Sequence, residues 1–107
     1  MKNIMKVEQF EVKNQFILEN DEQLIFQSYN SIIAVYDKEN DEMTLGNNWD
    51  YSTTTSKYLY KFIDTYFYYR NSKYNDLSKA LCNANNKRNI IKKAIESGLI
   101  KLNEVLR

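Results

Sequence analysis

Seven acidic side chains stand close together in two short polar segments of the N-terminal half. They are Glu19, Asp21, Glu22, Asp37, Glu39, Asp41 and Glu42. Paired carboxylates do acid–base chemistry only where their surroundings push their pKa values apart, and exposed turns do not do this. Asp37, Glu39 and Asp41 could loosely hold a divalent cation, but the EF-hand pattern is absent. We therefore expect the seven acids to act by charge, at a partner-binding surface that imitates nucleic-acid phosphates.

Groups able to form covalent bonds or hold a cofactor are scarce. The chain has no His, which removes the usual general base and the commonest metal ligand. Its one Cys, Cys82, has no His to activate it and cannot form a disulfide within the chain, which fits a reducing compartment. The two glycines, Gly46 and Gly98, form no phosphate-binding loop. We expect no enzymatic activity, no cofactor and no metal.

Basic side chains near the C-terminus offer an alternative, a nucleic-acid-binding site. The segment "NKRNIIKK" supplies candidate phosphate contacts: Lys87, Arg88, Lys92 and Lys93. A run of this kind is also explained as the solvated face of a helix. Residues 76–98 have about the length of a helix-turn-helix unit. However, the turn lacks the usual Gly, and the second helix carries few base-reading side chains, so sequence-specific DNA reading is disfavoured.

The stretch "WDYSTTTSKYLYKF", residues 49–62, combines aromatic, acidic, hydroxyl and basic side chains. Its rings could stack on bases while its lysines neutralise phosphates. A structural interpretation explains more of its positions. In it, Trp49 closes the sheet and Tyr51 packs at the end of a helix. Asp50 and Ser52 start that helix, because a hydroxyl caps free backbone N–H groups and an acid is favoured by the helix dipole.

Two tyrosines, Tyr60 and Tyr68, point away from the apolar side of the helix that the pattern predicts from residue 58 onward. An exposed Tyr gives contact area at small entropic cost, so both are candidate partner-binding residues. The alternative is that the segment 71–86 covers them.

The net charge of +1 conceals a split between the two halves of the chain. Residues 1–52 carry four Lys and ten acids, a net charge of −6, and residues 53–107 carry eleven basic residues and four acids, a net charge of +7. Such asymmetry suggests a charged partner for at least one half. The alternative is that the two halves attract each other within the fold.

The first half has the pattern of β-strands and the second half that of helices. Runs rich in β-branched and aromatic residues predict strands at 7–12, 15–19, 24–29, 31–36 and 43–46. Polar turns separate them at 19–23 and 37–42. Apolar spacing from residue 58 onward, with Ser52 or Thr53 as the cap, predicts a long helix, and it predicts further helices over 75–83 and 87–97. Gly98 can close the last helix in a left-handed conformation. The segment 99–102 favours a final strand over the alternative, a loose helix that continues with Val105 and Leu106.

These elements predict one α+β domain over residues 1–107. Its antiparallel sheet of four to five strands is packed by two to three helices, with a short C-terminal strand. No apolar run approaches the roughly 20 residues that span a bilayer, and the N-terminus shows no secretory signal. We therefore expect a cytoplasmic protein with no membrane partner.

Five short motifs resemble a small uncharacterised domain of phages, plasmids and other mobile elements of low-GC Gram-positive bacteria. They lie at residues 14–16 ("NQF"), 26–29 ("FQSY"), 31–34 ("SIIA"), 49–52 ("WDYS") and 95–98 ("IESG"). The likeness covers roughly residues 14–105, and this chain departs from it by an insertion at about 68–86. The resemblance implies a genomic neighbourhood and a fold, but no catalytic residues.

The resemblance and the charges together suggest a non-enzymatic accessory protein that acts in the cytoplasm of a host cell. Small proteins in such neighbourhoods counter host defences by binding a nuclease complex, so we expect an anti-CRISPR-like inhibitor whose partner is a bacterial protein or ribonucleoprotein. The alternative is a nucleic-acid-binding accessory protein that uses the basic helical half. A third option is a homodimer held by the opposite charges of the two halves.

Overall fold

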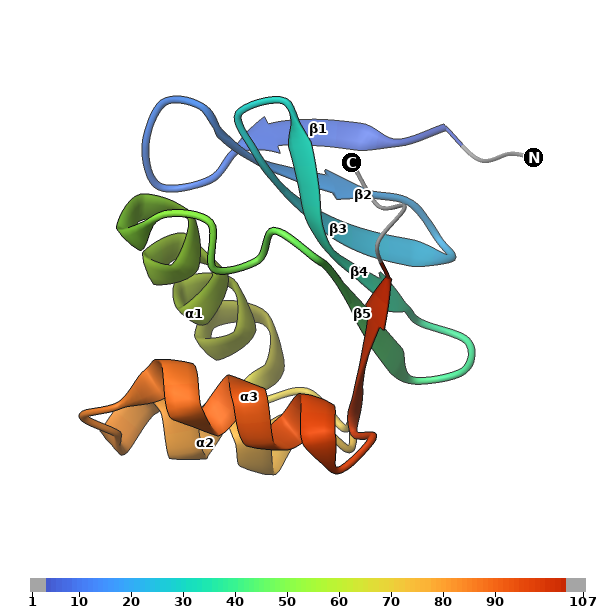
Figure 1. Cartoon of the computed structure of the whole chain (residues 1–107). Coiled ribbons are helices and arrows are strands. Elements are labelled where there is room, and N and C mark those ends of the chain that lie inside the picture. Colours follow the sequence, from blue (N-terminus) through green and yellow to red (C-terminus); the bar gives the residue numbers. More distant parts are fainter. Residues whose placement is uncertain (1–3, 104–107) are drawn as a thin grey trace.

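In the part of the chain that the structure describes, residues 4–103, six strands form one sheet and three helices cover one of its faces (Figure 1). In this computed structural model the strands are β1 (Lys6–Gln9), β2 (Gln15–Glu19), β3 (Gln23–Ser28), β4 (Ser31–Asp37), β5 (Glu42–Gly46) and β6 (Ile100–Asn103). The helices are α1 (Thr53–Phe67), α2 (Asn75–Asn83) and α3 (Lys87–Glu96). The predicted α+β class, with strands first and helices after, is confirmed.

The strands lie in the sheet in chain order, from β1 at one edge to β6 at the other. Neighbours from β1 to β5 are antiparallel, and the predicted hairpin of β2 and β3 places Ile17 opposite Phe26. The predicted C-terminal strand is confirmed as β6, but it runs parallel to β5. The three helices carry the chain back across the sheet, so it enters β6 in the direction in which it entered β5 (Figure 1).

The first strand is shorter than the predicted range 7–12, because the chain leaves the sheet after Gln9. Phe10 turns its ring into the core and is only 5% exposed. Glu11 then adopts a φ of 68°, which lies in the left-handed region and cannot continue a strand. The backbone N–H of Phe10 still donates to the carbonyl oxygen of Gln15 at 2.7 Å, which closes the loop.

The two faces of the sheet differ in what covers them. On one face the side chains are buried beneath the helices, among them Leu24, Phe26, Met43 and Leu45. On the other, the register places one row of apolar residues across four strands: Val7, Leu18, Ile25 and Val35. The helices lie on the opposite side from this row (Figure 1), and exposure along it falls from 61% at Val7 to 7% at Ile25. We call this second face the open face.

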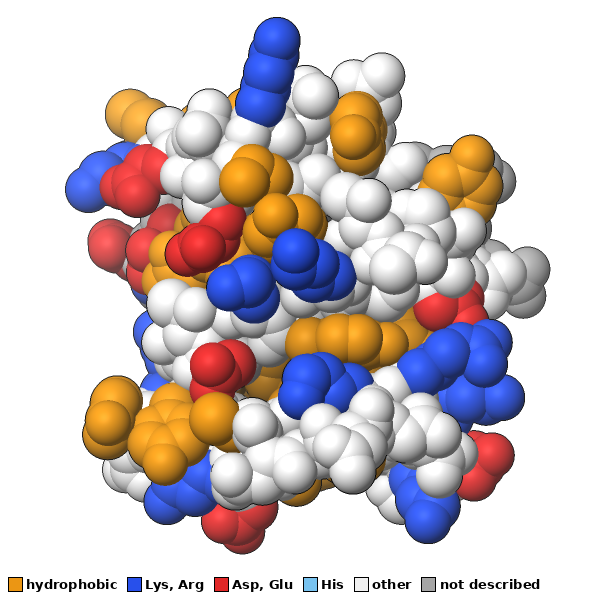
Figure 2. Space-filling model, turned by 90° about the vertical axis from the view of Figure 1, so that its left-hand side faces the viewer, with side chains coloured by type: hydrophobic (Ala, Val, Ile, Leu, Met, Phe, Trp, Pro, Cys, Tyr) orange, Lys and Arg blue, Asp and Glu red, His pale blue; other side chains and the backbone are white. Residues whose placement is uncertain are grey.

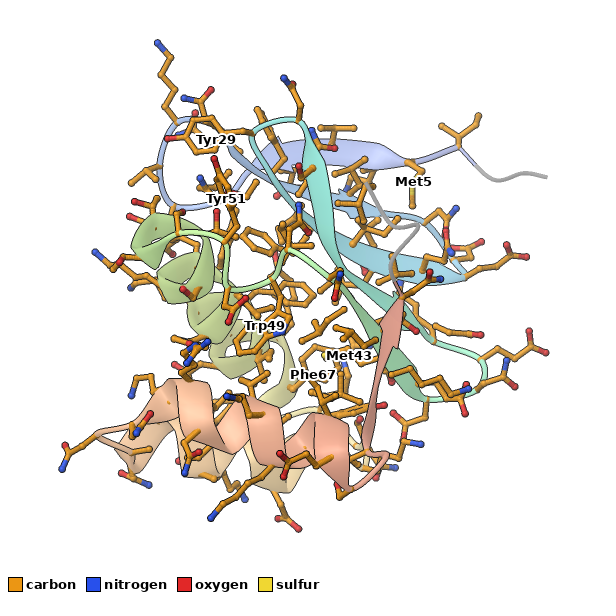
Figure 3. The ribbon with its side chains drawn as sticks, viewed as in Figure 1. Met5, Tyr29, Met43, Trp49, Tyr51 and Phe67 are labelled. Atoms are coloured by element: carbon orange, nitrogen blue, oxygen red, sulfur yellow. The ribbon has the colours of Figure 1, made fainter. Side chains whose placement is uncertain are left out.

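An aromatic cluster fills the space between the sheet and the helices. The ring of Phe26 in β3 stacks on that of Phe62 in α1, with ring centres 5.7 Å apart. Tyr36 in β4 meets Phe67 of α1 edge to face at 4.7 Å. Trp49, which precedes α1, points into the same interior (Figure 3). Contacts of this geometry add to the burial of the rings, so they fix α1 against the middle of the sheet.

The ends of the helices follow the predicted signals. The Oγ atom of Ser52 accepts a hydrogen bond from the backbone N–H of Thr55 at 3.1 Å, which caps α1. Gly98 has a φ of 86° just after α3, a conformation that suits glycine and turns the chain toward β6.

The prediction that Tyr51 packs at the end of the helix is wrong, because its side chain is 82% exposed. The backbone N–H of Tyr51 donates to the carbonyl oxygen of Asn48 at 3.0 Å and closes a turn. The turn directs the side chain of Trp49 into the core and leaves the side chain of Tyr51 exposed to solvent.

Tyr74, in the segment between α1 and α2, ties the helices to two strands. Its side chain is completely buried, and its ring meets Tyr36 and Phe67 edge to face. Its hydroxyl oxygen accepts a hydrogen bond from the backbone N–H of Met43 at 2.6 Å, and its O–H donates to the carbonyl oxygen of Leu99 at 2.9 Å. The hydroxyl thus bridges β5 and the residue that leads into β6.

We expect the substitution Tyr74→Phe to lower the free energy of unfolding by about 2–3 kcal/mol, because it leaves a backbone donor and a backbone acceptor without their partner in the interior. Urea unfolding measures this loss. Tyr69→Phe is the matched control, since Tyr69 is 92% exposed, and it should change little. Equal effects of the two substitutions would contradict the bridging role of the hydroxyl.

Candidate functional site

The turn between β2 and β3 lies against the turn between β4 and β5. The backbone N–H of Lys38 donates to the carbonyl oxygen of Glu22 at 2.9 Å, which joins the two turns. The seven acids predicted to bind a partner therefore gather at one end of the sheet. We call residues 19–22 and 37–42 the acidic end.

Two of these acids are paired with lysines. Glu19 accepts from the Nζ atom of Lys38 at 2.7 Å, and Glu42 accepts from Lys101 of β6 at 2.9 Å. Lys38 also donates to the carbonyl oxygen of Asn20, so it is held between the two turns. These two lysines neutralise part of the negative charge of the seven acids.

Two other acids accept hydrogen bonds, Asp37 within the second turn and Asp41 mostly from the segment between α1 and α2. The side-chain and backbone amides of Asn40, followed by the backbone N–H of Glu39, donate to Asp37 and hold the pKa of its carboxyl below the ordinary value. Asp41 is more deeply engaged. Its carboxylate accepts hydrogen bonds from three groups: the Tyr36 hydroxyl at 2.8 Å, the Ser72 hydroxyl at 2.6 Å and the Lys73 backbone N–H at 2.9 Å.

The remaining acids, Asp21, Glu22 and Glu39, are exposed at the tips of the two turns. The backbone beneath them is well fixed, because the side-chain oxygen of Asn20 accepts hydrogen bonds from the N–H groups of Glu22 and Gln23 at 2.9 and 2.8 Å. The acidic end therefore presents three outward carboxylates on a firm support.

The structure does not gather these carboxylates into a cation site. Within residues 4–103, no group of three or more His, Cys, Asp and Glu side chains is placed so that it could hold a metal ion. Asp37, Glu39 and Asp41 were the acids that could hold a cation. Of these, Asp41 instead accepts a hydrogen bond from the Ser72 hydroxyl.

The two candidate tyrosines lie in different surroundings. Tyr60 is half-buried against the core, and burial raises the pKa of its hydroxyl. Tyr68 meets the ring of its neighbour Tyr69 edge to face at 4.8 Å, and the Nζ atom of Lys79 in α2 lies 5.7 Å from its ring centre. Residues of the 71–86 segment thus contact Tyr68.

A groove crosses the face formed by α1 and the turn between α2 and α3 (Figure 2). Its volume is about 1160 Å³. Its charged lining residues are Asp50, Lys57, Lys61, Asp64, Lys87 and Arg88, and Tyr51 and Tyr60 add rings. Figure 2 shows blue Lys and Arg side chains on both sides of the hollow. This open, basic and partly aromatic groove is a second candidate surface.

The four predicted phosphate contacts divide between two places. Lys87 and Arg88 line the groove, whereas Lys92 and Lys93 are exposed farther along α3. Lys87 donates to the carbonyl oxygens of Leu81 and Ala84 at 2.7 and 2.9 Å and so closes the end of α2. Arg88 donates two hydrogen bonds to Asp50, the shorter at 2.7 Å.

The other two cations of the groove, Lys57 and Lys61, are exposed and lie one turn apart on α1. Lys61 lies 3.8 Å from Glu11, a loose contact between two half-exposed side chains. The sequence carries a signal for this pair, since their spacing places both on one side of the helix.

Three of the four ion pairs among the described residues join the acidic half of the chain to the basic half. They are Glu11–Lys61, Glu42–Lys101 and Asp50–Arg88. These pairs fit the alternative that the two halves attract each other within the fold, although partly exposed pairs contribute little stability.

The chain matches the model of a family of unknown function, DUF8033, over residues 1–84. Neither a curated protein nor a solved structure gives a significant match. None of the helices within residues 4–103 has the length and apolar character that crossing a membrane requires.

The substitution Asp41→Asn should lower the free energy of unfolding by about 1.5–3 kcal/mol at neutral pH, because the acceptor loses its charge and one of its two accepting oxygens becomes an NH2 donor. Burial acts to raise the pKa of the Asp41 carboxyl, but hydrogen bonds from Ser72, Lys73 and Tyr36 outweigh it and hold the pKa below the ordinary value. The stabilisation is therefore complete above about pH 4 and disappears as the pH falls through the lowered pKa.

Urea unfolding at pH 7 and at pH 3 tests the size of this loss and its dependence on pH. The difference in the free energy of unfolding between the wild type and D41N should be smaller at pH 3. Glu39→Gln, in the same turn, is the control and should leave stability unchanged. A gap that stays constant with pH would contradict the role given to the ionised carboxylate.

Proposed function

We propose that this chain, which belongs to the family of unknown function DUF8033, is a non-enzymatic binding protein that blocks a bacterial macromolecule. The observation that carries this proposal is the acidic end, where two hydrogen-bonded turns present Asp21, Glu22 and Glu39 outward. A fixed set of negative charges complements a basic surface and steers the approach to it.

The partner that we propose is the nucleic-acid channel of a host defence nuclease complex. Such a channel is lined with basic side chains that contact phosphates. The exposed carboxylates of the acidic end would occupy the positions of those phosphates. The resemblance to domains of mobile elements supports this choice of target. The firm backbone of the turns favours binding as well, because little conformational freedom is lost when the surface docks.

The double substitution D21K/E39K, with one acid from each turn, should abolish inhibition of DNA cleavage by a guide-directed bacterial nuclease. The reason is that attraction to the basic channel becomes repulsion. The matched control D76K/E96K changes the total charge equally on exposed positions of α2 and α3, and it should still inhibit. Both variants should melt near the wild-type temperature. Full inhibition by D21K/E39K would exclude the imitation of phosphates.

The groove favours a second function, binding of single-stranded nucleic acid. Lys57 and Lys61 are exposed there, and Tyr51 and Tyr60 line the same groove. Cations that follow a phosphate backbone beside rings that stack on bases form the usual site for such strands. The predicted contacts Lys92 and Lys93 lie apart from this groove, so the two basic surfaces can be tested separately.

Fluorescence anisotropy with a labelled oligonucleotide at 50 and 200 mM salt tests this second function. If the groove binds phosphates, the affinity should fall steeply with salt, and K57A/K61A should weaken binding about tenfold or more at low salt. K92A/K93A is the charge-matched control and should bind like the wild type. If K92A/K93A is the weaker variant, the outer face of α3 is the site instead. If the wild type does not bind at low salt, this function is excluded.

A further inference from the structure

Among residues 4–103, strand β1 forms an outer edge of the sheet and pairs only with β2 (Figure 1). All four of its residues are exposed. The N–H of Phe10 donates to the carbonyl oxygen of Gln15, and in an antiparallel pair such bonds recur at every second residue. The backbone groups of Lys6 and Glu8 therefore face β2. Those of the alternate residues face outward: Met5, Val7 and Gln9.

We propose that two copies of this chain pair along β1 in antiparallel fashion, about a two-fold axis at Val7. The outward N–H and C=O groups of Val7 then bond those of the partner's Val7, and Met5 and Gln9 bond across the same axis. The pairing would join two six-stranded sheets into one. A two-fold interface requires a surface that complements itself, and β1 meets this requirement in its backbone, its charges and its apolar side chain.

Charge selects this register over its neighbours. Only residues with outward backbone groups can form the hydrogen-bonded pairs, so the register changes in steps of two residues. With Val7 on the axis, Lys6 lies opposite the partner's Glu8, and Glu8 lies opposite the partner's Lys6. A shift by one step places Lys6 opposite Lys6 or Glu8 opposite Glu8. Unlike charges directly across a strand pair stabilise it and like charges destabilise it, so one register is favoured.

The open face supplies the apolar part of the contact. Val7 pairs with Leu18 of β2 and belongs to the row that continues through Ile25 to Val35. Val7 is the most exposed of these side chains, because nothing in the sheet flanks it on its outer side. Across the two-fold axis it would meet the partner's Val7, so the two rows would become continuous and both valines would lose contact with water.

Exchanging the two charges of β1 tests the pairing. K6E and E8K each place like charges opposite one another, so each variant should weaken self-association about tenfold or more. The double variant K6E/E8K restores unlike pairs in the same register and should associate like the wild type. An equimolar mixture of K6E and E8K should form a mixed dimer. Sedimentation velocity over about a hundredfold range of protein concentration follows these equilibria.

Amide hydrogen exchange identifies the strand involved. In the concentrated wild type the N–H groups of Val7 and Gln9 should be protected, and in E8K they should exchange freely. The proposal is overturned by a wild type that stays monomeric throughout, by a double variant as weak as the single ones, or by association that leaves the Val7 amide unprotected. Thermal unfolding of each variant checks that the fold is kept, and K6E/E8K provides the test should a single variant unfold.

Discussion

The buried hydroxyl of Tyr74 is the contact on which the closing of the sheet depends. It accepts from the N–H of Met43 in β5 and donates to the carbonyl oxygen of Leu99, the residue before β6. Its ring belongs to the aromatic cluster that holds α1 on the sheet. One side chain thus connects the segment between two helices, an inner strand and the last strand. Because all three helices lie on one face, the core is single and this contact lies within it.

Much of the fold could be predicted because its signals are local. The spacing of apolar residues marks α1, the hydroxyl of Ser52 caps it, and Gly98 marks the end of α3. The direction of β6 has no local signal, since it depends on how the helices lead the chain back. Nor could the inward turn of Asp41 be predicted, because its partners Tyr36 and Ser72 come from other elements.

The candidate site shows what a count of charges leaves out. The seven candidate acids of residues 19–42 do gather at one end of the sheet, as their places in turns suggest. Lys38 and Lys101 neutralise two of them, and two more carboxylates hold their own turn or a neighbouring loop. In the basic half, Arg88 is similarly held by Asp50. Which charges remain exposed depends on contacts between distant segments, so the location of the surface could be predicted from the sequence but its remaining negative charge could not.

The parallel pairing of β6 with β5 also bears on the order in which the chain acquires its shape. The strands from β1 to β5 are joined by short connections, and contacts between near neighbours in sequence form fast. Met43 and Ile100 lie far apart in the sequence, so β6 can dock only after the preceding strands and helices have been synthesised. Until then β5 has an unpaired edge, and an unpaired strand edge in a partly folded chain can form non-native pairs.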